Sequence, residues 1–136
     1  MTTPQITINS PISSTREVTV SPILILAVLT PAVWFVHGYH PFADDAGIYV
    51  AGIRKLADPT LYQPDAAFVL ANTRFSVFAH FFAAVVRTTR IPLAYLLLAT
   101  HLTSIFVFLL SCWSLARRIF ASPAAQWSAV ALTGAC

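Results

Sequence analysis

Two adjacent aspartates, Asp44 and Asp45, lie in a chain that otherwise avoids charge. The 136 residues include only five acids, and 57% of the residues are hydrophobic. A carboxylate at the edge of an apolar region can take a proton from a hydroxyl or an amine, or hold a divalent metal through hard oxygen ligands. Tyr49 follows Asp45 by four residues, so on a helix both side chains share a face. Tyr49 can then hydrogen-bond the carboxylate or stack on a sugar ring.

The same pair also has a purely structural interpretation. A helix that begins here leaves backbone N–H groups unbonded, and Asp44 belongs to the residue types that cap them. Asp45 at the first helical position would gain about 0.3–1 kcal/mol from the helix dipole. Because one residue occupies the cap, the second carboxylate is available for chemistry. The sequence does not decide between this role and a purely structural one, nor which aspartate has which role.

Composition predicts the class of protein that positions these residues. A soluble domain carries roughly 25% charged residues, whereas this chain carries 10% and has a mean hydropathy of +0.74. We therefore predict an all-α, polytopic transmembrane protein with amphipathic surface helices in its first long loop. The net charge of +3 reflects the scarcity of acids, and no run of Lys and Arg exceeds two, so we expect no nucleic-acid partner.

Hydropathy divides the chain into a polar tail at residues 1–20 and a helical membrane region at 21–136. The elements predicted in that region are a transmembrane helix at about 22–39, a surface helix at about 45–57, a short interfacial helix at about 66–88, a transmembrane helix at about 91–117, and the start of another at about 123–136. The last segment is too short to cross a bilayer. We therefore expect the N-terminal part of a longer protein, the alternative being a small complete one.

Other polar residues are candidates for binding. Arg54 and Arg74, and also Arg87, are possible partners of a phosphate. His101 lies inside the long predicted helix, where an ionisable residue is a functional hypothesis by default. Its alternative role is hydrogen bonding to a neighbouring helix, because a stripe of hydroxyl residues surrounds it. Asp65 is placed to cap the helix that follows it.

The order of these elements resembles a known family. "F-A-D-D-A-x-I-Y" follows the first apolar helix, "A-D-P-x-L-Y-x-x-D" closes the surface helix, "I-P-L-A-Y" begins the next span and "L-A-R-R-I-F" ends it. Over residues 20–136 this pattern resembles the N-terminal part of the polytopic membrane glycosyltransferases with the GT-C fold. It is most similar to the bacterial protein-mannosyltransferase and aminoarabinose-transferase-like branches.

The resemblance implies a function for the acidic pair. In the family, an acidic residue of the first extracytoplasmic loop acts as general base or metal ligand, and Asp44 and Asp45 match it by position. A divalent cation such as Mg²⁺ or Mn²⁺, a polyprenyl-phosphate sugar donor and a multi-pass location in the bacterial inner membrane are then expected. The loops of the family that recognise the lipid phosphate are absent from this chain. The loop from 40 to 90 holds five cations against three elsewhere, which opposes the family's orientation.

Two other functions remain open. The chain can be a non-catalytic integral membrane protein or subunit that docks through its surface helix. It can also be a transporter fragment, with His101 and the acidic pair on an ion path. In each case the expected partners are the lipid bilayer and further helices, of the same chain or of a partner subunit.

Overall fold

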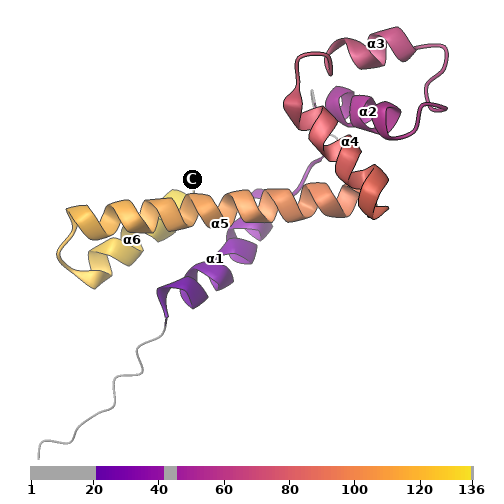
Figure 1. The fold of residues 1–136 in the computed structure, drawn as a ribbon. Coiled ribbons are helices and arrows are strands. Elements are labelled where there is room, and N and C mark those ends of the chain that lie inside the picture. The colour runs from indigo at the N-terminus through magenta and orange to yellow at the C-terminus, as the bar shows by residue number, and fades with distance from the viewer. Residues whose placement is uncertain (1–20, 42–45, 136) are drawn as a thin grey trace, which may run out of the picture.

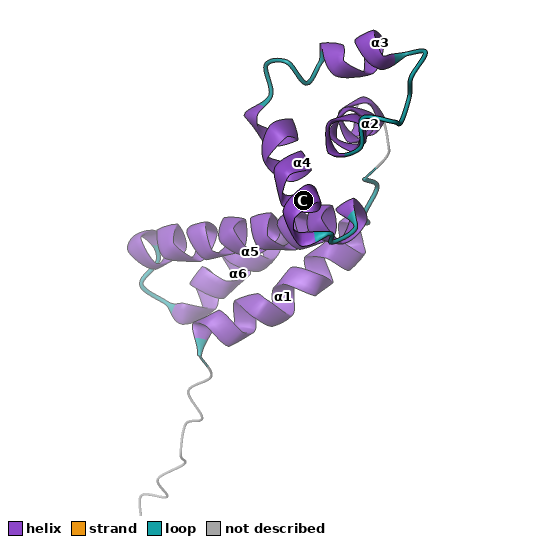
Figure 2. Ribbon diagram, turned by 45° about the vertical axis from the view of Figure 1, so that its right-hand side comes forward, coloured by secondary structure: helices purple, strands orange, loops and turns teal. Residues whose placement is uncertain are grey.

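The computed structural model describes residues 21–41 and 46–135, and all regular secondary structure within these residues is helical. The fold drawn in Figure 1 has these helices in chain order: α1 (Pro22–His37), α2 (Ala46–Ala57), α3 (Ala66–Ala71), α4 (Val77–Thr89), α5 (Leu93–Ile119) and α6 (Pro123–Ala135). Figure 2 shows the same described residues coloured as helix and loop, with no strand. The prediction of an all-α fold is therefore confirmed for this part of the chain.

Within the described residues, one helix is long and apolar enough to cross a membrane. α5 has 27 residues, and its most apolar window has a mean hydropathy of 2.1. At 1.5 Å per residue its length is about 40 Å, which exceeds the bilayer core of about 30 Å. α1 and α4 are apolar but have 16 and 13 residues, below the roughly 20 that a spanning helix needs. The prediction of several spans thus stays a prediction.

The helices are arranged around α5. In Figure 1, α1 and α6 lie beside α5, while α2, α3 and α4 lie beyond the end at which α5 begins. Gly134 of α6 allows α6 to approach α1 and α5 closely, because a Cβ at this position would lie 2.8 Å from Val33 Cγ2 and 3.4 Å from Leu109 Cδ2. Nearby, His37 at the end of α1 lies with its Nε2 3.0 Å from the Gly134 carbonyl oxygen.

Two separate apolar clusters hold these groups together. The bundle cluster, from α1, α5 and α6, centres on the buried side chains of Leu26, Leu109 and Val130. The surface-helix cluster joins α2 and α4 to the first turn of α5 and contains Val50, Ile53, Ala79, Phe82, Ala83 and Leu93. Since α5 contributes to both clusters, it fixes the group of surface helices relative to the bundle.

The segment predicted as one interfacial helix at about 66–88 is divided by the structure into α3 and α4. The Thr73 hydroxyl donates to the Leu70 carbonyl at 2.8 Å, which closes a turn after α3. Ser76 then begins α4, since its Oγ accepts the Ala79 N–H at 3.2 Å. Asp65 occupies the N-cap position of α3, but its side chain makes no capping hydrogen bond.

α2 approaches α3 closely at Gly52. A Cβ at Gly52 would collide with Thr73 Cγ2 and lie 3.2 Å from the Val69 carbonyl oxygen. Thr73 is itself 2% exposed, so its methyl group has little room to move. Packing therefore favours a glycine at this position.

The loop after α2 is held by two polar residues. Lys55 is 8% exposed, and its ammonium donates to the carbonyls of Pro59 at 2.6 Å and Leu61 at 2.7 Å. The Asp58 carboxylate accepts hydrogen bonds from the Thr60 hydroxyl and backbone N–H, which lower the pKa of Asp58. The loop therefore has a defined conformation, although it lies on the surface.

Candidate functional site

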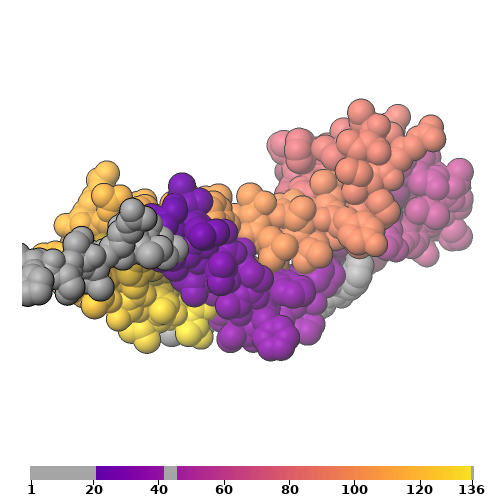
Figure 3. Space-filling model, turned by 90° about the horizontal axis from the view of Figure 1, so that it is seen from below, coloured from indigo at the N-terminus to yellow at the C-terminus, as the bar shows by residue number. Residues whose placement is uncertain are grey.

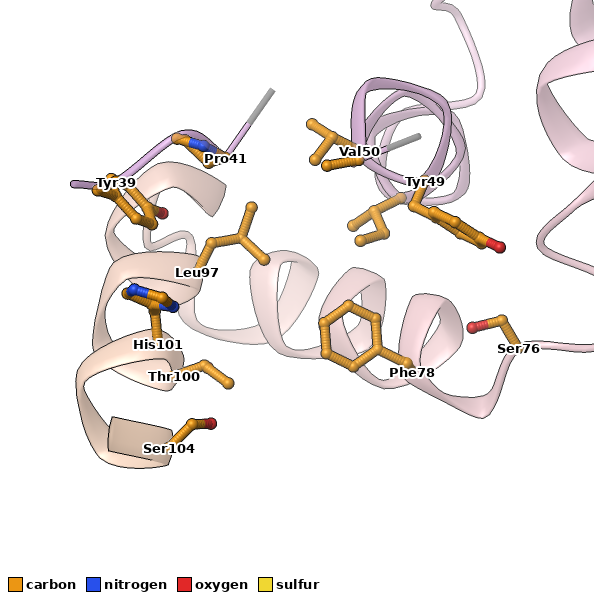
Figure 4. Close-up of a pocket in the computed structure, with 12 residues that line it drawn as sticks. Tyr39, Pro41, Tyr49, Val50, Ser76, Phe78, Leu97, Thr100, His101 and Ser104 are labelled. Atoms are coloured by element: carbon orange, nitrogen blue, oxygen red, sulfur yellow. The ribbon is translucent and has the colours of Figure 1, made fainter. Parts of the chain in front are cut away.

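A cavity of about 630 Å³ lies between α5 and the surface helices. Its lining comes from four places in the chain: Tyr39 and Pro41 after α1; Ala46, Tyr49, Val50 and Ile53 of α2; Ser76 and Phe78 at the start of α4; and Leu97, Thr100, His101 and Ser104 of α5. Figure 4 shows the α5 side chains on one side of this cavity, opposite those of α2 and α4. Along α5, the polar lining residues Thr100, His101 and Ser104 lie between Leu93 of the surface-helix cluster and Leu109 of the bundle cluster.

Two polar atoms of the lining residues are covered from solvent and have no hydrogen-bond partner among residues 21–41 and 46–135. They are the Tyr39 hydroxyl and the His101 Nε2. The two rings are neighbours, with centroids 5.4 Å apart and planes tilted by 41°. A buried polar group without a partner costs about 1–3 kcal/mol. A turn of either ring toward the cavity would let a bound group pair with its polar atom and remove this cost, so the two rings are a candidate binding element.

One of the other hydroxyl groups of this wall, that of Thr100, is already engaged. The Thr100 hydroxyl donates to the Leu96 carbonyl at 2.8 Å within α5. The facing wall is apolar where Val50, Ile53 and Phe78 line it. The cavity thus combines apolar side chains with several polar ones, among them Tyr39, His101 and Ser104, an arrangement that suits an amphipathic ligand.

The acidic pair, Asp44 and Asp45, lies outside the described residues. The described residues on either side of it, Pro41 and Ala46, both line the cavity. Tyr49, predicted to share a helix face with Asp45, also lines the cavity from α2. The structure therefore brings together Tyr49 and His101, which the sequence had singled out for separate reasons.

The predicted arginine partners of a phosphate lie elsewhere. Arg54 is exposed on α2 and does not line this cavity. Arg74 follows α3 and borders a separate hollow of about 240 Å³ on the outside of the surface helices. Arg87 is exposed in the last turn of α4. Neither Arg54 nor Arg74 is therefore placed to bind a ligand inside the cavity as the structure stands.

Residues 21–41 and 46–135 contain no group of three or more His, Cys, Asp or Glu side chains placed to hold a metal ion. The carboxylates predicted as metal ligands, Asp44 and Asp45, lie between these ranges.

Sequence reasoning missed Tyr39. The signal that could have found it is Gly38, which has a φ of 76° and ends α1 with its N–H bonded to the Trp34 carbonyl at 2.9 Å. Glycine favours this backbone conformation. A glycine after an apolar helix indicates that the next side chain leaves the helix, and Tyr39 leaves it toward His101.

Comparisons with protein families, with curated proteins and with solved structures found no match. Assignment of a function must therefore come from the site itself.

Proposed function

We propose that the chain is the N-terminal portion of a multi-pass glycosyltransferase of the bacterial inner membrane. It transfers a sugar from a polyprenyl-phosphate-linked donor to an acceptor at the extracytoplasmic face. The observation that carries this proposal is the cavity of about 630 Å³, which is lined by Pro41 and Ala46, the described residues on either side of the acidic pair in the sequence, and which has apolar walls and two lining residues with an unpartnered polar atom. A polyprenyl-linked sugar has matching properties, because it joins a long apolar chain to a polar head.

The acidic pair supplies the reactive group in this proposal. Asp45 is joined to the lining residue Ala46 by one peptide bond, and consecutive Cα atoms are about 3.8 Å apart. One carboxylate takes the proton from the acceptor hydroxyl or amine, which then attacks the anomeric carbon. The bond between that carbon and the phosphate oxygen breaks, and polyprenyl phosphate leaves. Asp44 and Asp45 are also the residues that would hold Mg²⁺ or Mn²⁺, whose charge would stabilise the leaving phosphate.

The polar pair in the cavity orients the ligand. The Tyr39 hydroxyl can donate a hydrogen bond, and His101 Nε2 can donate or accept one according to its tautomer. Both atoms can therefore bind a sugar hydroxyl or a phosphate oxygen. Tyr49 lies at the α2 side of the same cavity, where its ring can stack on the sugar.

Substitution of the acidic residues tests the assignment. In the intact membrane protein, Asp44→Asn or Asp45→Asn should reduce sugar transfer by about 10²–10⁴-fold, the usual contribution of a general base. Asp58→Asn is the matched control, because Asp58 lies in the exposed loop after α2 and does not line the cavity. Transfer of labelled hexose from polyprenyl-phosphate hexose in membranes is the measurement. Full activity of both Asn variants would show that the assigned role is wrong.

Binding tests the polar pair separately from chemistry. Tyr39→Phe and His101→Leu should each weaken binding of undecaprenyl phosphate to the chain in nanodiscs by about tenfold or more, since a hydrogen bond to a charged group contributes about 1.5–3 kcal/mol. Ser111→Ala is the control. Ser111 is an exposed hydroxyl residue of the same helix whose Oγ donates to the Val107 carbonyl at 2.8 Å. Equal affinity of all three variants would refute this part of the proposal.

One observation also favours a non-catalytic membrane subunit. Only 11% of the most apolar window of α5 is buried, so this helix has room for partner helices. In a transferase, further helices of the same chain would cover it, whereas a subunit would use those of another protein. A subunit would tolerate Asp44→Asn and Asp45→Asn without loss of transfer activity, so the same assay separates the two functions.

A further inference from the structure

α4 is apolar on two opposite faces. Its inner face packs against α2 through Ala79, Phe82 and Ala83, which are buried. Its outer face is exposed, and we define this face as Phe75, just before the helix, together with Val77 and Phe81. These side chains are 94%, 86% and 58% exposed. A helix that rests on a core and faces water normally has polar residues on its outer side. The outer face of α4 is therefore suited to contact with an apolar partner or an apolar phase.

Exposed cations precede and follow this face in the chain. Arg74 precedes it, Arg87 lies in the last turn of α4, and Arg90 follows the helix in a left-handed conformation with a φ of 58°. No acidic residue follows Asp65 in the sequence. A partner that suits this surface is therefore apolar where it contacts the phenylalanines and negatively charged where it contacts the arginines.

The position of α4 is set by α5. Only Ile91 and Pro92 follow Arg90 before α5 begins at Leu93. The outer face of α4 is thus tethered to one end of the candidate membrane span. Figure 3 shows α4, in salmon, in a lobe at the opposite end of the molecule from α6, in yellow. A helix tethered in this way lies near the boundary between lipid and water when α5 spans the bilayer.

We propose that the outer face of α4 binds the surface of a bilayer that contains anionic phospholipids. Phe75, Val77 and Phe81 enter the boundary between head groups and acyl chains, and the guanidinium groups bind lipid phosphates. Aromatic residues flanked by arginines are the composition of interfacial helices. This lipid contact is independent of the proposed transferase activity, since it uses neither the cavity nor the acidic pair.

Fluorescent labelling of the full chain tests the apolar contact. Cys112 and Cys136 are replaced by serine, and an environment-sensitive dye is attached to Phe81→Cys or, as control, to Thr60→Cys in the exposed loop after α2. The chain is placed in nanodiscs of phosphatidylcholine, alone or mixed with phosphatidylglycerol. Spin-labelled lipids should quench the dye at position 81 in the mixed nanodiscs and leave the dye at position 60 unquenched. Equal quenching at both positions would overturn the proposal.

Charge variants test the anionic contact. Arg74→Gln with Arg87→Gln should lower the ratio of bilayer-bound to detached α4 in mixed nanodiscs by about fivefold per arginine, the equivalent of about 1 kcal/mol each. Arg117→Gln with Arg118→Gln, at the other end of α5, removes the same charge and should leave quenching at position 81 unchanged. Salt should reduce the contact, because the Debye length falls from about 10 Å at 0.1 M to about 3 Å at 1 M. Quenching at position 81 that is the same in both lipid mixtures would show that the surface does not recognise anionic lipid.

Discussion

Gly52 of α2 lies against Thr73, which follows α3. This close approach predicts that the effect of Gly52→Ala on stability changes sign with the residue at position 73. In the natural chain, the new methyl group collides with Thr73 Cγ2. Overpacking of this kind costs about 1–3 kcal/mol, while alanine stabilises a helix interior by about 1 kcal/mol relative to glycine. We therefore expect Gly52→Ala to destabilise the surface helices by about 0–2 kcal/mol.

Thr73→Ser removes the colliding methyl group and keeps the hydroxyl that donates to Leu70. In this background, Gly52→Ala retains its helix-propensity gain of about 1 kcal/mol. Only the contact with the Val69 carbonyl oxygen, at 3.2 Å from the added Cβ, opposes this gain. The same substitution should therefore stabilise α2 or leave it unchanged, and the coupling free energy between the two sites should be about 1–3 kcal/mol.

Amide hydrogen exchange of residues 46–57 in nanodiscs measures this coupling, because it reports the local opening free energy of α2. The four chains of the double-mutant cycle are compared under identical conditions. Gly134→Ala is the control. Its added Cβ meets Val33 and Leu109 in the bundle, so its effect should be independent of Thr73→Ser. Equal effects of Gly52→Ala in both backgrounds would refute the packing that the structure gives between α2 and α3.

Two further predictions concern the loop after α2. Lys55→Met removes the ammonium that bonds the carbonyls of Pro59 and Leu61 and should destabilise the loop by about 1–3 kcal/mol; unchanged amide exchange in this loop would contradict that role. Thr60→Ala should raise the pKa of Asp58 toward its usual value, as followed by the carboxyl carbon shift in NMR, because the Thr60 hydroxyl is the largest cause of the lowered pKa. The folded pKa of Asp58 lies below the unfolded one, so its contribution to stability is present above the unfolded pKa and is lost as the pH falls through the folded pKa. A pKa of Asp58 that is unchanged in the Thr60→Ala variant would refute the assigned hydrogen bond.

Sequence patterns located the helices well where apolar runs or apolar spacing were long. The predicted span at about 91–117 corresponds to α5 at Leu93–Ile119, and the predicted surface helix at about 45–57 corresponds to α2 at Ala46–Ala57. Helix ends near prolines and glycines could also be predicted, because proline restricts and glycine extends the allowed backbone conformations. The break between α3 and α4 was missed, although the polar residues Asn72, Thr73 and Arg74 mark it in the sequence.

The candidate site was only partly predictable. His101 was noted as a polar residue within a long apolar helix, and Tyr49 was noted for its spacing from Asp45. That both line one cavity depends on how α2 packs against α4 and α5, which a local pattern does not contain. The contact between the rings of Tyr39 and His101 could not be predicted either, since it joins residues from distant parts of the chain.

The separation of the two apolar clusters has a consequence for the order of folding. Leu26 and Leu109 pack together in the bundle although roughly 80 residues separate them, and closing so long a loop is entropically costly. The surface helices lie within that loop and have their own cluster. If they fold first, the effective loop becomes shorter, and each halving of its length lowers the closure cost by about 0.6 kcal/mol. The surface-helix cluster would then act as an early folding unit that brings α1 to α5.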